Sequence, residues 1–473
     1  MKSTDEQQAI TDCVCATPPN PLILVDSVAG SGKTTLLTAI AGALPHTNGL
    51  YLAYNKSVAT ESQRKFPATT HCMTTHSMAY RATVKPFKLK LGTFSHRDIT
   101  ERIKYDLKYE IISHIRSFCL SKHLSFGDYA AVNHLKTTTT VIANRYLSMM
   151  QSGKLECTHD FYLKFFHILL DKGSVTYDPF DFIMLDEAGD LNEVTLEIFK
   201  LLPSPRKIAV GDKYQNIYGF NDTINCFNVL ANEGITLKMT QSFRVAPHIA
   251  TKIETFCQKY LDPAMKFSGT KPSSTTIKTR GFLTRTNGAL INKMILLNAQ
   301  NIPYGLVRKA SDIFKVPLML CSLKYQGFIT DPSYKHLQSD IDEWHDDPDL
   351  RSKFTTVLSY LSTLYPEDVQ LIQAIRLLQR HKRAVVLDTY EEARKHEKGN
   401  YDYTLATVHS CKGAEFDEVT IADDLNESIA DIYDSVSTGR SITTLSPQEV
   451  ESLNLYYVAT TRAAKELFNA RYL

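Results

Sequence analysis

The chain lacks the marks of several protein classes. Its nine cysteines among 473 residues include no C-x-x-C pair, which argues against a disulfide framework or a zinc site and favours reduced thiols. No apolar run approaches the ~20 residues that cross a bilayer. The stretch 1–10 is polar, unlike a signal peptide. We therefore expect a soluble, intracellular protein.

The chain also has little net charge and little repetition. A formal charge of +2 gives no overall field that would attract nucleic acid, so such a partner would need a local basic surface. No internal repeat is visible, and the only low-complexity run, Thr137–Thr140, is predicted to be a linker or a β-rich edge. The length suits roughly three or four domains of about 100–150 residues each.

Short strand-like runs alternate with helical stretches along most of the chain, which is typical of α/β folds with parallel sheets. The runs that we expect to form strands are 22–25, 49–54, 182–185, 207–210, 281–284, 384–387, 404–408 and 419–422. Two stretches, 81–156 and 302–380, carry helical periodicity instead, clearest at 98–118 and 366–380. They are predicted to be insertions in the α/β domains.

A glycine-rich run directly after the expected strand 22–25 is the most informative motif. A strand, a glycine-rich turn and a helix form a cradle for nucleotide phosphates. Gly30 and Gly32 let backbone N–H groups face the anion without an intervening Cβ. Lys33 can reach the β- and γ-phosphates, and the Thr34 hydroxyl can ligate Mg²⁺. The whole run consists of Ala29, Gly30, Ser31, Gly32, Lys33, Thr34 and Thr35.

The expected strand 182–185 ends in two carboxylates that would complete a nucleotide site. Asp186 is predicted to support the metal, and Glu187 to polarise the attacking water. Taken alone, such a pair is as often a helix N-cap, but the upstream phosphate loop favours catalysis. Gln215 follows another strand end and can sense the γ-phosphate, because its amide both donates and accepts hydrogen bonds.

Aromatic and basic residues downstream leave two interpretations open. Phe220, next to Gly219, is either a core aromatic or a platform for an unstacked base, whereas Tyr218 is expected in the core. Arg244 and Arg462 are either solvated surface residues or arginine fingers that neutralise charge on the γ-phosphoryl group. The sequence alone does not show whether these arginines converge on the phosphate loop.

In this order, the motifs resemble those of the UvrD/Rep-type superfamily 1 helicases, and most of all the branch of the F-box DNA helicases with their phage and bacterial relatives. The resemblance covers nearly the whole chain, and so many ordered motifs do not arise by chance. The matching segments are the Q motif at 4–10, two early DNA-contacting motifs at 51–56 and 74–80, a stretch of the F-box branch at 158–164, the DEAQD box at 185–190, motif V at 407–416 and motif VI at 451–463.

The resemblance implies an α/β fold with two RecA-like motor domains, each built on a parallel sheet and each carrying a mainly helical inserted subdomain. The first motor domain would comprise 1–80 and 157–235 with the insertion 81–156, and the second would comprise 236–301 and 381–473 with the short insertion 302–380.

The resemblance also implies roles for single residues. Gln7 would read the adenine edge, Phe243 would stack on the adenine and Glu415 would hold the ribose, with ATP and Mg²⁺ as the ligands. Arg244 and Arg462 would be the arginine fingers. The implied DNA contacts come from the early motifs and from segments further downstream, and they are Tyr54, Asn55, Thr75, His76, Phe220 and His409.

Two residues depart from the family pattern. Ser27 stands where the phosphate loop usually begins with glycine or another small residue, which is a mild change because the glycine-rich centre is intact. Gly189 replaces the glutamine of DEAQD, and so removes an amide that in the family helps to link the ATP site to neighbouring motifs. We expect ATP hydrolysis to survive this change, while its coupling to DNA is left open.

The function implied by the resemblance is an ATP-dependent DNA helicase or translocase. It would move 3′ to 5′ on single-stranded DNA and act at junctions of single-stranded and duplex DNA in replication, recombination or repair. A monomeric motor, cytoplasmic or nucleoid-associated and without membrane contact, is the expectation. Two alternatives stay open: an RNA-directed superfamily 1 helicase, and a DNA-binding ATPase whose unwinding is weak.

Overall fold

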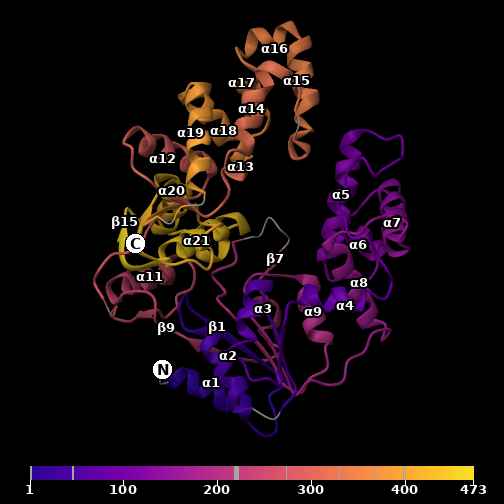
Figure 1. Cartoon of the computed structure of the whole chain (residues 1–473), viewed down its shortest axis with the longest axis vertical. Coiled ribbons are helices and arrows are strands. Elements are labelled where there is room, and N and C mark those ends of the chain that lie inside the picture. The colour runs from indigo at the N-terminus through magenta and orange to yellow at the C-terminus, as the bar shows by residue number, and fades with distance from the viewer. Residues whose placement is uncertain are drawn as a thin grey trace. The chain divides into compact units, whose positions relative to one another are not determined.

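The computed structural model describes residues 3–44, 47–217, 223–272, 274–329, 331–366, 368–397, 399 and 401–473. The predictions for Tyr218, Gly219 and Phe220 lie outside the described residues. The chain divides into two compact units, Met1–Gln241 and Ser242–Leu473 (Figure 1).

The first unit is built on a six-stranded parallel sheet with the strand order β3-β2-β4-β6-β1-β8. Because β1, β6 and β4 are consecutive in this order and parallel, the residues that follow them meet at one edge of the sheet. The strands are β1 (Leu22–Ser27), β2 (Gly49–Leu52), β3 (Thr70–Met73), β4 (Phe182–Leu185), β6 (Lys207–Gly211) and β8 (Ile235–Met239).

Helices bury both faces of this sheet, because side chains alternate between the faces along each strand. Tyr51 and Met184 face one layer, whereas Leu52 and Leu185 face the other. The first layer contains α1 (Asp5–Cys15), α2 (Lys33–Ala43) and α3 (Lys56–Ser62). The second contains α4 (Thr75–Ala82), α5 (Tyr105–Leu120), α6 (Phe126–Val132), α7 (Thr137–Gln151), α8 (His159–Asp171), α9 (Glu193–Leu201) and α10 (Cys226–Leu230).

Polar side chains fix where the helices near the motifs begin. Thr4 and Gln7 form a capping box at the start of α1. Asn55 caps α3 and Thr74 caps α4, each by accepting a hydrogen bond from a backbone N–H in the first turn. A short antiparallel pair, β5 (Leu191–Asn192) with β7 (Thr223–Ile224), also belongs to this unit.

The stretch between β3 and β4 is helical, and α5, α6, α7 and α8 pack together there (Figure 1). The prediction of a linker or β-rich edge at Thr137–Thr140 is wrong, since these threonines form the first turn of α7. Thr139 is buried and its hydroxyl lies 3.3 Å from a carboxylate oxygen of Glu110, so burial on α5 outweighs the weak helix propensity of threonine.

The second unit contains a five-stranded parallel sheet with the order β12-β13-β11-β14-β15. The strands of this sheet are β11 (Arg280–Thr284), β12 (Gly305–Leu306), β13 (Tyr403–Thr407), β14 (Phe416–Ile421) and β15 (Ala463–Phe468). The short strand β9 (Gln241–Ser242) spans the unit boundary, and β10 (Ser268–Gly269) follows it. The helices that flank this sheet are α11 (Pro247–Tyr260), α12 (Asn287–Ala299), α20 (Asp423–Ser437), η3 (Ile442–Thr444) and α21 (Pro447–Thr460).

A run of helices separates β12 from β13 in this unit, and α14 to α18 pack together within it (Figure 1). The run comprises α13 (Ala310–Ile313), α14 (Lys315–Gln326), η2 (Pro332–Tyr334), α15 (Leu337–Asp346), α16 (Pro348–Lys353), α17 (Val357–Leu364), α18 (Val369–Arg380) and α19 (Arg383–His396).

Two sequence-based expectations differ from the structure in detail. The expected strand 384–387 lies inside α19, because the short apolar run Ala-Val-Val-Leu belongs to an amphipathic helix and buries only Val386 fully. The expected boundary between residues 235 and 236 cuts into β8, which pairs with β1 and so keeps the chain in the first unit up to Gln241.

The predicted fold class is confirmed: both units are α/β structures with parallel sheets, consistent with two RecA-like domains. Within the residues described, no helix is both long enough and apolar enough to cross a membrane.

Candidate active site

The phosphate loop connects the carboxyl end of β1 to the start of α2. Gly30 and Gly32 have φ of +74° and +82°, a backbone region that glycine enters without a Cβ clash. Gly32 is the N-cap of α2, whose first N–H groups are therefore available to an anion. Ser31 is buried, and among the described residues its hydroxyl has no hydrogen-bond partner. A buried orphan hydroxyl beside free N–H groups fits a bound phosphate.

Ser27 has a structural role at the start of this loop. Its hydroxyl donates to the carbonyl of Gly211 at 2.8 Å, and the side chain is buried. A glycine at this position would lose that bond between the ends of β1 and β6. The departure from the phosphate-loop pattern is thus compensated by a contact with the neighbouring strand.

Lys33 meets the carboxylates that follow β4. Its Nζ lies 3.4 Å from Oε1 of Glu187. Burial opposes the charge of this ammonium, but the nearby carboxylates of Glu187, Asp186 and Asp212 prevail and raise the pKa of Lys33. Lys33 is therefore cationic at neutral pH, as a phosphate-binding lysine must be.

Asp186 is buried, and its carboxylate is fixed by two hydrogen bonds. The hydroxyl of Tyr51 donates to Oδ2 at 2.6 Å, and the backbone N–H of Glu187 donates to Oδ1 at 2.9 Å. Burial, and then the repulsion from Glu187, raise the pKa of this carboxyl, against the opposing effect of Lys33. Sequence reasoning assigned no role to the Tyr51 hydroxyl.

Glu187 sits in a strained turn. Its φ is +53°, which is uncommon for a residue other than glycine. The turn is held because the N–H of Ala188 donates to the carbonyl of Val210 at 3.0 Å and the N–H of Asp190 donates to the carbonyl of Glu187 at 3.1 Å. This backbone conformation directs the Glu187 side chain toward Lys33.

Gly189, the second departure from the family pattern, lies against the backbone that follows β6. A Cβ at Gly189 would lie 2.2 Å from the carbonyl oxygen of Asp212. Glutamine therefore has no room at this position. The backbone of the 186–190 turn contacts the backbone after β6 directly, where the family would use an amide side chain.

Asp212 orders the segment 212–215, which follows β6 and contains Gln215. Its Oδ2 accepts a hydrogen bond from Nε2 of Gln215 at 2.9 Å, and its Oδ1 accepts from the N–H of Tyr214 at 3.0 Å. Asp212 is buried and attracts the Lys33 ammonium. The sequence pattern contained this carboxylate but gave no reason to single it out.

Gln7 ties α1 to the phosphate loop. Its side-chain Nε2 donates to the carbonyl of Ser31 at 3.3 Å, and its Oε1 accepts from the N–H of Thr4 at 3.2 Å. The residue predicted to read the adenine edge is thus anchored on the loop that would hold the phosphates.

These residues fit a magnesium nucleotide. Left-handed glycines, a cationic lysine and an orphan serine hydroxyl suit phosphate, while the Thr34 hydroxyl and the Asp186 carboxylate are oxygen donors of the kind that Mg²⁺ prefers. Thr35 is exposed on the outer side of the first turn of α2.

A cavity of about 490 Å³ in the first unit is lined both by three predicted DNA contacts and by Asp186, the predicted metal ligand. Tyr54, Thr75 and His76 line it together with Asp186 and Asp190. Tyr54 is 53 % exposed, and Asn55 next to it caps α3 through its own Oδ1. The cavity therefore connects the predicted nucleotide site with the predicted DNA contacts within the first unit.

His76 is held on the wall of this cavity by aromatic residues of α8. Its Nδ1 lies 3.3 Å from the hydroxyl of Tyr162, which also lies 3.1 Å from Nδ1 of His159. Burial lowers the pKa of His76, and the attraction of Asp160 only partly offsets this effect. His76 is consequently neutral at physiological pH and acts as a hydrogen-bonding group.

In the second unit the structure pairs two predicted nucleotide residues with each other. Nε of Arg244 donates to Oε2 of Glu415 at 2.9 Å. Phe243, predicted to stack on adenine, is 39 % exposed beside Arg244. His409 follows β13 and is half-buried.

Arg462 is buried in the same unit, with 1 % of its surface exposed. Its guanidinium donates to the carbonyls of Val458 at 3.0 Å and Ala414 at 3.3 Å. In this arrangement the side chain fastens the end of α21 to the segment before Glu415. The role of Arg462 as an arginine finger stays a prediction.

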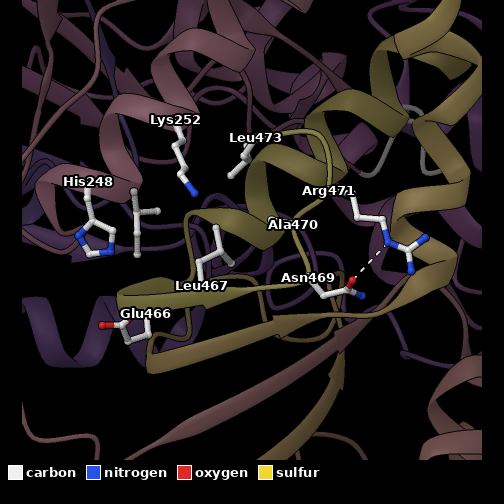
Figure 2. A pocket seen from close by; sticks show the side chains of 9 residues that line it. His248, Lys252, Glu466, Leu467, Asn469, Ala470, Arg471 and Leu473 are labelled. Atoms are coloured by element: carbon white, nitrogen blue, oxygen red, sulfur yellow. Dashed lines mark hydrogen bonds between the residues drawn. The ribbon is translucent and has the colours of Figure 1, made fainter.

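A second cavity, of about 330 Å³, lies in the second unit between α11, the end of β15 and the residues that follow β15 (Figure 2). His248 and Lys252 of α11 and Arg471 surround it, and Nε of Arg471 donates to Oδ1 of Asn469 at 3.3 Å. None of the predicted site residues lines this cavity.

Two family models match successive parts of the chain. Residues 10–221 match an AAA domain, and residues 351–471 match the UvrD-like helicase C-terminal domain. The first contains the phosphate loop and the 186–190 turn, and the second contains Glu415 and Arg462. The family models thus correspond to the two units in the same order as the motifs.

Two relatives align along nearly the whole chain. F-box DNA helicase protein 1 of Schizosaccharomyces pombe (strain 972 / ATCC 24843) is 25 % identical over 523 residues, which cover 98 % of this chain and 57 % of the relative. F-box DNA helicase 1 of Gallus gallus is also 25 % identical over 523 residues, which cover 100 % of this chain and 49 % of the relative. The chain spans about half the length of these curated relatives. The chain thus carries an AAA domain and a UvrD-like helicase C-terminal domain, and it is similar along its length to F-box DNA helicases of superfamily 1.

Proposed function

We propose that the chain is an ATP-dependent motor that moves along single-stranded DNA and unwinds or remodels duplex at single-strand junctions. One observation carries the proposal. Asp186 belongs both to the group of carboxylates around Lys33, where we expect the phosphates, and to the cavity lined by Tyr54, Thr75 and His76. A change in the bound nucleotide would therefore reach, through Asp186, side chains that can hold a DNA strand.

The first unit holds the groups that hydrolysis of ATP requires. The N–H groups around Gly30 and Gly32 and the Lys33 ammonium would bind the phosphates, with Thr34 and Asp186 as Mg²⁺ ligands. When bound, Mg²⁺ neutralises negative charge on the phosphate oxygens. Lys33 would leave Glu187 for the phosphates, which frees the Glu187 carboxylate to accept a proton from water.

Gln7 would contact the adenine edge at one end of the nucleotide, and Gln215 would contact the γ-phosphate at the other end. Gln215 is oriented for this by its bond to Asp212. Its amide would sense the γ-phosphate, and the contact would be lost once phosphate leaves.

Residues of the second unit would complete the site. In the proposal, Glu415 binds the ribose and Arg244 binds the γ-phosphate. The ion pair between these two side chains therefore opens when ATP binds. Arg462 would act as the second finger, and Phe243 would stack on the adenine. Positive charge opposite the γ-phosphate accelerates its transfer by orders of magnitude. Closing and opening of the two units once per ATP would then drive stepping.

DNA is the proposed track for two reasons. Both relatives are named as DNA helicases. In addition, the helical segment 81–156 carries thirteen Lys and Arg against six Asp and Glu, although the whole chain has a net charge of only +2. A local basic surface suits a phosphate backbone, so binding should weaken steeply with salt. Movement 3′ to 5′ and a monomeric state are part of the proposal.

An unwinding assay with matched DNA and RNA substrates tests this function. Duplexes with 3′ tails, 5′ tails, forks and four-way junctions are incubated with ATP and the wild-type chain or Lys33→Ala. We expect unwinding of 3′-tailed and forked DNA by the wild type. Lys33→Ala should lose ATP hydrolysis at least about 100-fold and keep single-strand binding, because the lysine contacts phosphates rather than DNA. Unwinding of RNA alone, or ATP hydrolysis unaffected by Lys33→Ala, would contradict the proposal.

A further inference from the structure

The hydroxyl of Tyr51 donates a hydrogen bond to one carboxylate oxygen of Asp186, the proposed metal ligand. It lies 2.6 Å from Oδ2 of Asp186, and both residues are at least nine-tenths buried. The other oxygen, Oδ1, accepts a backbone bond from Glu187. In the described part of the chain, the orientation of the Asp186 carboxylate is thus set by one phenol and one peptide group.

The fold places this phenol on the nucleotide side of the sheet. Tyr51 pairs with Met184 across β2 and β4, and side chains two residues apart share a face. Asp186 therefore lies one step beyond Met184 on the face that also carries α2 and the phosphate loop. The Tyr51 ring stacks on Phe66 with 4.8 Å between centroids, which holds the ring independently of its hydroxyl.

A buried serine of α3 lies near the phenol. Ser62, the last residue of that helix, is close enough to the Tyr51 hydroxyl to lower its pKa, against the larger effect of burial. Asn55, an expected DNA contact, caps the other end of α3. The helix α3 thus carries a predicted DNA contact at its start and a neighbour of Tyr51 at its end.

We infer that Tyr51 is a positioning residue that holds Asp186 in the orientation for Mg²⁺ binding with the nucleotide. The inference rests on the proposed function, since it presumes that Asp186 is a metal ligand. Hydrogen bonds to a metal-binding carboxylate fix its direction, and their loss commonly lowers metal affinity about 10- to 100-fold. Tyr51 itself touches neither the metal nor the nucleotide in this scheme.

The test measures Mg²⁺ affinity through nucleotide binding, without turnover. A fluorescent, non-hydrolysable ATP analogue is titrated onto the full chain in EDTA, and then at rising Mg²⁺ concentrations. For Tyr51→Phe we expect about a 10-fold higher Mg²⁺ concentration at half-maximal enhancement of binding. Binding in EDTA should stay within about twofold of wild type, because Tyr51 acts through the metal ligand alone.

A matched control removes a phenol of the same kind elsewhere in the unit. Tyr146 is also buried and also donates to a carboxylate, Oε2 of Glu101, at 2.6 Å, but it lies in α7 outside the site. Tyr146→Phe should leave the Mg²⁺ requirement unchanged. Ser62→Ala should raise it by less than Tyr51→Phe, because the phenol keeps its own bond to Asp186.

A double-mutant comparison separates positioning from general damage. Asp186→Asn should raise the Mg²⁺ requirement by itself, and adding Tyr51→Phe should change it no further, because the two residues act as one unit. An unchanged Mg²⁺ requirement in Tyr51→Phe, additive effects in the double variant, or equal loss of binding in EDTA would overturn the inference. Failure of the wild type to bind the nucleotide at all would instead refute the proposed function.

Discussion

Gly189 joins two segments of the active site by backbone contact. A Cβ at this position would lie 2.2 Å from the carbonyl oxygen of Asp212, and one at Gly211 would lie 2.7 Å from the nitrogen of Gly189. Both distances are below what real Cβ atoms adopt, so the two glycines are required together. In the sequence, Gly189 looked like the loss of a glutamine amide. In the structure, it lets the backbone of the 186–190 turn approach the backbone after β6 more closely.

Gly189→Ala should therefore destabilise the first unit by about 1–3 kcal/mol, as overpacking at a rigid backbone contact does. The comparison is with Gly42→Ala, since Gly42 lies in α2, where an added methyl group would meet no atom within 4 Å, and should tolerate or gain from alanine. Denaturant unfolding of both variants, followed by far-UV circular dichroism, measures the difference. Equal stability of the two variants would show that the contact is looser than described.

Lys164 is an unusual buried cation in α8. Its Nζ donates to the carbonyls of Ser121 and His123, at the end of α5 and just beyond it, with 2.9 Å to the oxygen of His123. Burial lowers the pKa of Lys164 to about 8 and, followed by repulsion from Lys164, that of His167 to about 3. Lys164 thus supplies hydrogen bonds to carbonyl groups at the carboxyl end of α5, although burial of its charge is unfavourable.

This predicts a specific pH dependence of stability. Between about pH 8 and the ordinary lysine pKa near 10.5, the unfolded chain binds a proton at Lys164 that the folded chain does not, so folding becomes more favourable as pH rises. From pH 8 to pH 9.5 the gain relative to Lys164→Met should be about 2 kcal/mol. Urea unfolding of both proteins at these pH values measures the gain, and parallel pH profiles would contradict the assignment.

The elements show what sequence patterns can and cannot predict. The run 182–185 became β4 with the expected ends because it is apolar throughout and is followed by charge. The similar run 384–387 became part of α19, since four apolar residues do not distinguish a strand from a buried helix turn. The charged residues that follow this run continue the helix to His396, and they distinguish a helix from a strand here.

The same limit applies within the candidate site. The sequence placed Lys33 and Glu187 in one predicted nucleotide site, and the structure brings them together because the segments that carry them follow parallel strands of one sheet. The hydrogen bond from Tyr51 to Asp186 depends on the register of β2 against β4 and on a side-chain direction, which spacing along the chain does not encode. The roles assigned to Arg244 and Arg462 depend on both units and stay predictions.

The division into units makes a prediction about truncated chains. A fragment of residues 1–241 keeps β8, which pairs with β1 and buries Met239 in the core under α1 and α2. It should unfold cooperatively and retain nucleotide binding. A fragment of residues 1–235 exposes the edge of β1 and should lose both properties. Thermal unfolding and nucleotide titration distinguish the two, and equal behaviour would favour the shorter boundary expected from the sequence.

The chain leaves the first unit through β8, whose last residue is bonded to the phosphate loop. The carbonyl of Met239 accepts from the N–H of Val28 at 3.0 Å, and the N–H and hydroxyl of Thr240 donate to Glu6 of α1 at 2.8 and 2.7 Å. The second unit begins immediately afterwards, at Ser242. In the proposed cycle, a pull on that connection would therefore act directly on the base of the phosphate loop, where the nucleotide would be held.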